Sequence, residues 1–495
     1  MTVTPIPRAL MQCACLLALL GLASCNLYNS PYRTMPQKRV SVSATNPPGP
    51  GYDLQFIESD DQGWFWKPDQ AVSALSSIKK ATTEGDTLVL LFIHGWHHSA
   101  ACYDDNVEAF KRVLQTLHDE LNQPMYSQAM PAAKSMRIIG LYVGWRGRSL
   151  PGLIDYTTFW GRKSAARRVG DGDLQEFMAR LQRIYNDHSD GTDGKQKRFF
   201  GLVSIGHSFG GAVLLTATSH YFESQLQLAN PTSGFLSTAP VMPTGAPVPD
   251  TSPSAKPAPM KHTIGGFGDM VVLVNPAVEA AAYERINILS RGINYSSDQT
   301  PLLVTFSAQN DGARHSWFKA GRIAGEFFTN AAPVPDDRER TSLREALGVY
   351  DYGDSGITHS LTPSEPRQLI SGQENERPDL QCTDKRPDTF EWWRWADKRV
   401  SPDTSFPNDT LNVKTSTVEA LKFFDFSKEA QYSGLNLKPE LSVVHHQPFM
   451  VVSVDKRIID GHNGIFSEPF MNFLTRYIGL TEAKRISLGI EASKR

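Results

Sequence analysis

One serine of this sequence stands in a pattern that suits nucleophilic chemistry. Ser208 lies at the centre of Gly206-His207-Ser208-Phe209-Gly210, with an apolar run before it and an apolar, helix-compatible segment after it. The order strand, sharp turn, helix holds a serine in a strained backbone conformation with its hydroxyl above a sheet. The bare five-residue pattern arises by chance roughly 0.2 times in a chain of this length, so its context carries the prediction.

A serine hydroxyl is a weak nucleophile at neutral pH and needs a base that accepts its proton. His462 is the predicted base, because the glycine-flanked loop 460–464 between the last strand and the last helix can carry its imidazole over the sheet edge. The rival histidines are His94, His97, His98, His207, His315, His445 and His446. The adjacent pair among them predicts no metal site, since neighbouring residues of an extended segment point to opposite sides.

The third group must be an acid that orients the base and stabilises its charge. Asp311 is the predicted acid, because it stands in a polar turn just after the apolar run 302–306. The carboxyl ends of parallel strands are where an open α/β sheet places its ligands. Glu279, just past the preceding run 270–274, is the alternative acid.

Ester chemistry at a serine also needs N–H donors aimed at the oxyanion that develops on the substrate carbonyl. The backbone N–H of Phe209, the residue after the nucleophile, is one predicted donor. The N–H of Trp96 is the other, because the segment 94–96 directly follows the apolar run 87–93 and Gly95 lets the backbone turn an amide inward. The bulky side chains of Trp96 and Phe209 are candidate walls of an acyl pocket.

The elements that must position these residues alternate along the chain. Continuous apolar runs predict buried strands at 87–93, 136–143, 199–205, 270–274, 302–306 and 449–454. Helical spacing of apolar residues predicts helices at 104–121, 173–185 and 467–478. The alternation predicts an α/β fold with a mostly parallel central sheet and helices on both of its faces.

This set of motifs resembles the α/β-hydrolase superfamily, especially its bacterial serine esterases and lipases. The resemblance rests on the segments 93–96 and 206–211 and on the chain order Ser208, Asp311, His462. It implies the α/β-hydrolase fold, a catalytic triad of these three residues, and cleavage of a small-molecule or lipid ester through an acyl-enzyme. The resemblance implies no metal and no cofactor.

The resemblance covers about residues 86–330 and 445–480, and the long stretch between the acid and the histidine departs from a minimal member. Two other functions stay open beside ester hydrolysis. An acyltransferase would use the same triad with an alcohol or lipid acceptor in place of water. A non-catalytic lipoprotein of the cell envelope would keep the fold for binding.

The chain divides into a core and an insertion. Residues 51–330 form the predicted core, with an N-terminal extension and a Pro-rich surface loop at 236–262. Residues 331–447, which are rich in Pro, Asp and Ser, are predicted to form an insertion or cap that shapes the pocket. Residues 448–495 are predicted to form the final strand, the histidine loop and the closing helix of the core.

The N-terminal residues have the pattern of a targeting segment. A basic residue and a short apolar run within residues 1–25 fit a signal peptide, and Leu22-Ala23-Ser24-Cys25 resembles the bacterial lipobox, whose cysteine becomes lipidated. Asn26 follows, and by the same resemblance the absence of Asp there implies retention in the outer membrane, facing the periplasm. Residues 26–50 are polar and predict a flexible tether between lipid anchor and body.

The charge and the cysteine content of the chain bear on its partners and on its disulfide bonds. A formal net charge of -2 gives no reason to expect a nucleic-acid partner. Of five cysteines, only Cys102 and Cys382 lie beyond the predicted signal and lipidation site. Two thiols in an oxidising compartment can pair, so a disulfide between them is the hypothesis.

Overall fold

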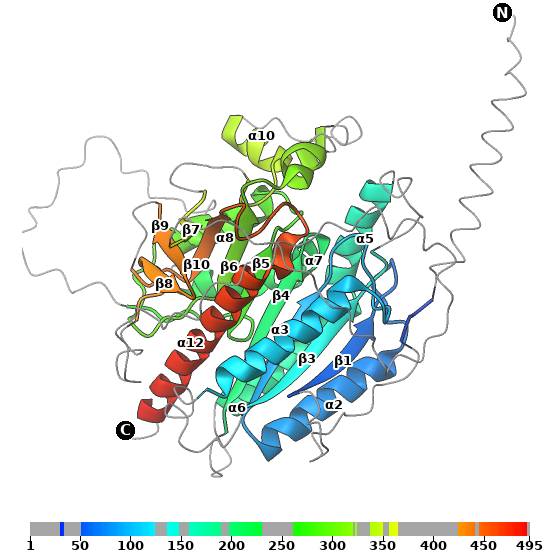
Figure 1. Ribbon diagram of the computed structural model, residues 1–495, viewed down its shortest axis with the longest axis vertical. Coiled ribbons are helices and arrows are strands. Elements are labelled where there is room, and N and C mark those ends of the chain that lie inside the picture. The colour runs from blue at the N-terminus through cyan, green and yellow to red at the C-terminus, as the bar shows by residue number, and fades with distance from the viewer. Residues whose placement is uncertain are drawn as a thin grey trace, which may run out of the picture.

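The computed structural model is that of an α/β protein built on one ten-stranded sheet (Figure 1). The segments that the structure describes are 30–33, 51–123, 136–147, 158–189, 198–229, 261–319, 322–323, 337–349, 356–364, 424–440 and 445–492. Within them no helix is both long and apolar enough to cross a bilayer.

The sheet is mostly parallel, as the sequence predicts. Its strand order is β1-β3-β2-β4-β5-β6-β10-β7-β9-β8, and every pairing is parallel except those of β9 with β7 and β8. The strands are β1 (Tyr52–Glu58), β2 (Thr87–Ile93), β3 (Arg137–Gly144), β4 (Phe200–His207), β5 (Met270–Val274), β6 (Leu303–Ala308), β7 (His359–Pro363), β8 (Ala430–Tyr432), β9 (Leu435–Pro439) and β10 (Phe449–Val454).

Helices cover both faces of the sheet. The α-helices are α2 (Pro68–Glu84), α3 (Asp105–Leu121), α5 (Phe159–Asp171), α6 (Asp173–Ser189), α7 (Phe209–Ala229), α8 (Ala281–Arg291), α10 (Asp337–Arg344) and α12 (Glu468–Ala492). Helices α3 and α12 lie side by side over one face (Figure 1), where Arg476 pairs with Glu120 at 2.5 Å. Helices α2, α5, α6, α7 and α8 pack on the other face.

Two hydrophobic cores result from the alternation of side chains along buried strands. In β2, Val89, Leu91 and Ile93 join the core under α7, while Leu88 and Phe92 join the core under α3. Since all seven residues of β2 are buried, the strand is a continuous apolar run rather than an alternating one. This explains why a buried strand could be predicted from the sequence of β2 alone, without knowledge of the strands that pair with it.

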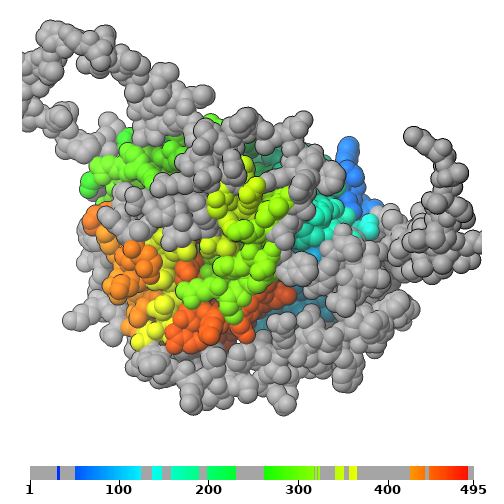
Figure 2. All heavy atoms as spheres, turned by 90° about the horizontal axis from the view of Figure 1, so that it is seen from above, coloured from blue at the N-terminus to red at the C-terminus, as the bar shows by residue number. Residues whose placement is uncertain are grey.

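The structure adds strands that the sequence pattern did not reveal. The segment 51–85, expected to be an extension packed on the core, begins with β1, which pairs in parallel with β3 at the edge of the sheet. Within 331–447, the predicted insertion, β7, β8 and β9 continue the same sheet beyond β10. In Figure 2 the orange residues near the end of the chain accordingly lie on the opposite side from the blue and cyan ones of its first third.

Several predictions fall outside the described residues. They concern the signal peptide 1–25 with Cys25, almost all of the loop 236–262, and Cys382. Four residues within the predicted tether 26–50 are described, and two of them, Tyr32 and Arg33, contact the folded body. The backbone N–H of Arg33 donates to Glu58, at the end of β1, over 2.7 Å.

The junction of β4 and α7 leaves no room for a side chain at Gly206. A Cβ added to Gly206 would lie 2.6 Å from the carbonyl oxygen of Gly210 and 2.8 Å from the Cα of Gly211. Both contacts are with backbone, so the helix would have to move. Gly206→Ala should therefore lower the free energy of unfolding by about 2 kcal/mol, the usual cost of overpacking.

Urea unfolding measures this loss, and Gly161→Ala is the matched control. A Cβ on Gly161, in α5, meets nothing within 4 Å. Because alanine favours a helix over glycine by about 1 kcal/mol, this control should be neutral or more stable than the wild type. Equal stability of the two variants would contradict the close approach at Gly206.

Candidate active site

Ser208 occupies the turn between β4 and α7 in a left-handed backbone conformation, with φ of 55°. Its N–H donates to the carbonyl of Val274 in the neighbouring strand β5 over 3.1 Å. A Cβ on Gly210 would collide with the carbonyl oxygens of Ile93 and His94, so the first turn of α7 packs directly on the end of β2. Close backbone packing on two sides therefore maintains the conformation of this serine.

Three side chains far apart in the sequence form one hydrogen-bonded chain at the carboxyl edge of the sheet. His462 Nε2 lies 2.7 Å from Ser208 Oγ, and His462 Nδ1 lies 2.7 Å from Asp311 Oδ2. An ionised carboxylate can only accept, so Nδ1 carries the proton and Nε2 accepts from the serine hydroxyl. The structure thus brings together the serine, histidine and aspartate that the sequence singled out.

Asp311 is fully buried, and Arg314 is its second partner. Arg314 Nε donates to Asp311 Oδ2 over 2.6 Å, and the Arg314 N–H donates to Oδ1 over 3.1 Å. Burial alone would raise the pKa of Asp311, but the hydrogen bonds and charges of His462 and Arg314 hold it well below its usual range. The carboxylate is therefore ionised at neutral pH and keeps its acceptor role.

Arg314 connects this carboxylate to three other parts of the fold. Only 1% of its side chain is exposed. Its guanidinium donates to Ser307 Oγ in β6 over 2.8 Å, to the carbonyl of Leu347 over 2.9 Å and to Asn275 Oδ1 over 3.3 Å. The aspartate is thus fixed by an arginine that is itself fixed at several points.

Asn275 is buried directly after β5, and its side chain hydrogen-bonds both to the loop of His462 and to the end of β6, just before Asp311. Its Oδ1 accepts from the N–H of Ala308 over 2.8 Å, and its Nδ2 donates to the carbonyls of His462, over 2.9 Å, and Gly461, over 3.2 Å. Its φ of 46° is a conformation that asparagine tolerates better than most residues. This one side chain therefore sets the histidine loop relative to strand β6.

His207 supports the same loop from the other side. Its Nε2 donates to the carbonyl of His462 over 3.1 Å, and the two rings lie 5.2 Å apart. Burial holds the pKa of His207 well below its usual value, so the ring is neutral. Among the described residues its Nδ1 has no hydrogen-bond partner.

The loop after β2 lies against the nucleophile. A Cβ on Gly95 would come within 2.7 Å of Ser208 Cβ, which places the segment that carries Trp96 beside the serine. His94 Nδ1 donates to the carbonyl of Gly95 over 2.8 Å, and its Nε2 accepts from the N–H of Trp145 over 3.0 Å. Burial lowers the pKa of His94 to about 4, so the neutral ring can both donate and accept.

The two residues predicted to supply the oxyanion donors directly follow Ser208 and Gly95, which lies against it. Phe209 begins α7, and the first N–H groups of a helix have no acceptor within the helix. The rings of Trp96 and Phe209 lie 6.2 Å apart, and Phe159, from the start of α5, packs between 5.1 and 5.5 Å from both. These aromatic side chains therefore pack together, with the ring of Phe209 buried in the core and those of Trp96 and Phe159 half-buried against it.

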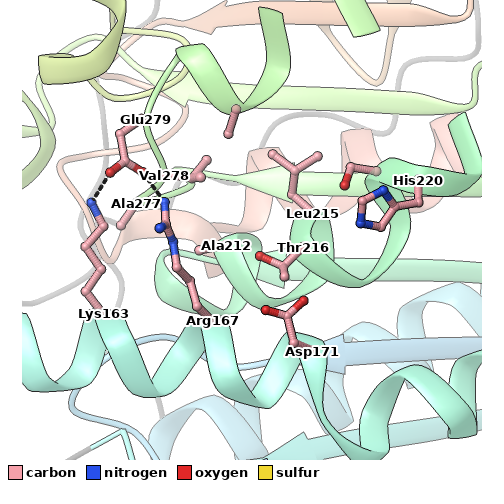
Figure 3. A pocket seen from close by; sticks show the side chains of 12 residues that line it. Lys163, Arg167, Asp171, Ala212, Leu215, Thr216, His220, Ala277, Val278 and Glu279 are labelled. Carbon is pink, nitrogen blue, oxygen red and sulfur yellow. Dashed lines mark hydrogen bonds and ion pairs between the residues drawn. The ribbon is translucent and has the colours of Figure 1, made fainter. Parts of the chain in front are cut away.

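Glu279, the alternative acid, has a different environment. It lines a groove of about 250 Å³ between α5, α7 and α8 (Figure 3) and pairs with Lys163 at 2.5 Å and Arg167 at 3.4 Å. Burial lowers the pKa of Lys163 to about 8. Ser208 does not line this groove, so Glu279 is not the partner of the base.

Most of the rival histidines have other partners, and the ring of His97 packs 4.0 Å from that of Trp96. His98 lies 3.0 Å from the helix-capping Asp104, His445 and His446 lie 3.3 and 3.6 Å from Asp425, and His315 is exposed. The described residues contain no cluster of three or more His, Cys, Asp or Glu that could hold a metal ion.

Cys102 is buried and disulfide-bonded. Since Cys382 lies outside the described residues, its pairing with Cys102 stays a prediction.

Sequence reasoning missed two supporting residues, Asn275 and Arg314. A signal was present for each. Asn275 directly follows an apolar strand at the edge that binds ligands, and Arg314 follows Asp311 at the spacing of one helical turn. Their long-range partners, which give them their roles, could not be read from the pattern.

The buried histidines of this fold make its stability depend on pH. Burial lowers the pKa of His94 and of His359, in β7, to about 4, while each would titrate near 6.5 in the unfolded chain. The unfolded state therefore binds more protons, and stability falls as the pH drops from about 6.5 toward 4. Between pH 7 and pH 5 we expect a loss of about 2 kcal/mol for each such histidine.

Urea unfolding at the two pH values measures the loss, and His359→Gln provides the comparison. His359 lies away from Ser208 and bonds the carbonyl of Ser427 over 3.0 Å. The variant should lose about 2 kcal/mol less than the wild type over this interval, whatever its stability at pH 7. An identical pH dependence in the variant would show that His359 is not buried in its neutral form.

Comparison of the chain with protein-family models, with curated proteins and with solved structures gives no match in any of the three. The chemistry of this site must therefore be judged from its geometry. That geometry joins a serine held at a sharp turn, an imidazole oriented by a buried carboxylate, and a backbone loop and helix start that lie beside the serine.

Proposed function

We propose that the protein is a serine hydrolase of the α/β-hydrolase fold that cleaves carboxylic esters. The observation that carries the proposal is the unbroken chain of hydrogen bonds from Ser208 through His462 to Asp311, with 2.7 Å at each step. A nucleophile, a base and a base-orienting acid within hydrogen-bond reach are the diagnostic arrangement for covalent catalysis by serine.

In the first half-reaction, Ser208 Oγ attacks the ester carbonyl carbon while its proton passes to His462 Nε2. Asp311 stabilises the resulting imidazolium through Nδ1. The N–H groups of Trp96 and Phe209 donate to the oxyanion of the tetrahedral intermediate. The imidazolium then gives its proton to the leaving alcohol oxygen as the C–O bond breaks, which leaves an acyl group on the serine.

In the second half-reaction, water replaces the alcohol. His462 takes a proton from the water as its oxygen attacks the acyl carbon, and the proton returns to Ser208 Oγ when the ester bond to the enzyme breaks. The products are a carboxylic acid and an alcohol, and every proton is accounted for by His462. These two half-reactions use only groups of this chain and water.

The side chains near the serine favour an apolar acyl group. Trp96 and Phe159 are half-buried, with ring centroids 5.5 Å apart, and they rest on the buried rings of Phe209 and Phe318. Apolar groups gain free energy when they leave water for such a surface. Together with the lipobox-like sequence at Cys25, this supports an ester hydrolase anchored in the bacterial cell envelope.

Replacement of the nucleophile is the most direct test of the reaction. Ser208→Ala should lower kcat for short acyl esters by about 10⁴-fold or more, because the triad acts as a unit. Ser204→Ala is the matched control, since this serine lies in β4, the strand that leads to Ser208, is fully buried and has a hydroxyl without a partner among the described residues. Undiminished turnover in Ser208→Ala would exclude the mechanism.

The histidine loop offers a second test. In Asn275→Asp a carboxylate would face the carbonyl oxygens of Gly461 and His462 in place of the Nδ2 donor. A displaced base costs roughly 10²-fold in rate, so kcat should fall by that order while KM changes little. Initial rates across ester concentrations measure both constants. A rise in KM at unchanged kcat would contradict the positioning role of Asn275.

A further inference from the structure

The segment 30–33 is attached to the folded body by a compact set of contacts. The N–H groups of Tyr32 and Arg33 donate to the two carboxylate oxygens of Glu58 over 2.9 and 2.7 Å. Arg33 Nε donates to the carbonyl of Ala100 over 2.7 Å, and Gln70 Nε2 donates to the carbonyl of Arg33 over 2.7 Å. The Arg33 guanidinium also lies 4.0 Å above the ring of Phe56.

These contacts place the segment at one corner of the molecule. Glu58 ends β1, the edge strand, at the same carboxyl edge where Ser208 follows β4. The strand order puts β1 three strands from β4, which corresponds to about 14 Å at the usual spacing. We call the surface of residues 59–66 and the first turn of α5 the anchor corner.

Two tryptophans are exposed at the anchor corner. Trp64 is 68% exposed and Trp160, in the first turn of α5, is 38% exposed. Their segments are joined by Arg162, whose guanidinium donates to both carboxylate oxygens of Asp61 over 2.6 and 2.7 Å. Tryptophan, with a large apolar ring and one polar N–H, favours the boundary between a bilayer and water.

The length of chain before this segment limits how far the corner can lie from a lipid anchor. The lipobox-like sequence places the lipidated residue at Cys25, five residues before Ser30. Five extended residues span at most about 18 Å. The far end of α7, which carries Leu228, lies roughly 30 Å along that helix from Ser208, at the opposite edge of the sheet.

We infer that the protein docks on a lipid bilayer through the anchor corner, with the contacts of Tyr32 and Arg33 to Glu58 fixing that orientation. The surface in contact with lipid is then the one that carries Trp64 and Trp160, and the opposite edge faces away. On the proposed function, the esters within reach would be those presented at the membrane surface. The orientation itself depends on lipidation of Cys25 and does not depend on hydrolysis.

The test uses the full chain, purified from bacterial membranes and reconstituted in vesicles of phosphatidylethanolamine and phosphatidylglycerol. Its mass establishes lipidation of Cys25, and a chain without lipid would overturn the inference. A fluorophore is attached in turn to Trp64→Cys and to Leu228→Cys, whose parent residue is 74% exposed. A spin-labelled lipid should quench the first fluorophore several-fold more strongly than the second; equal quenching would overturn the orientation.

Two changes then test the attachment. Glu58→Ala removes the acceptor of Tyr32 and Arg33, and a Gly/Ser spacer of about twenty residues inserted before Ser30 lengthens the tether without touching the folded body. The substitution should remove the difference between the two labelled positions, and the spacer should reduce it. A difference that persists unchanged in both would overturn the role of the segment 30–33. Because ester turnover is not measured, failure here is distinct from failure of the proposed reaction.

Discussion

The buried charge of Asp311 is the constraint on which the site depends. A carboxylate withdrawn from water costs several kcal/mol unless hydrogen bonds and opposite charge compensate it. His462 and Arg314 meet this requirement on one oxygen, at 2.7 and 2.6 Å, and the N–H of Arg314 bonds the other. The buried guanidinium of Arg314 needs acceptors of its own, and Asn275 Oδ1 and Ser307 Oγ provide two of them. The hydrogen bonds that stabilise the buried carboxylate therefore continue to the ends of β5 and β6.

The order of strands in the sheet brings Ser208 and His462, which are 254 residues apart in the sequence, within hydrogen-bond distance. Strands β4, β5, β6 and β10 are consecutive neighbours and run in the same direction. Their carboxyl ends therefore present Ser208, Asn275, Asp311 and His462 in spatial order along one edge. The chain between β6 and β10 supplies strands that extend the sheet beyond β10, which lets a long segment separate the acid from the base without disturbing their contact.

Much of this arrangement could be predicted from sequence, and the rest depends on contacts that a local pattern does not contain. The central strands are continuous apolar runs, and each of the three site side chains stands in a turn or loop directly after one of them. Strand β1 was missed because it is an edge strand with a mixed polar sequence, Tyr52–Glu58. The roles of Asn275 and Arg314 come from partners up to 187 residues away, and such partners can only be assigned once the sheet is assembled.

The central claim is that Ser208 is the nucleophile that becomes acylated. Peptide mapping by mass spectrometry, after treatment of the folded protein with a fluorophosphonate, tests it most directly. We predict a single covalent adduct on the peptide that contains Ser208, formed when the native protein is treated and absent when the protein is unfolded in urea before the reagent is added. An adduct on another residue, or no adduct in a protein that is demonstrably folded, would contradict the account.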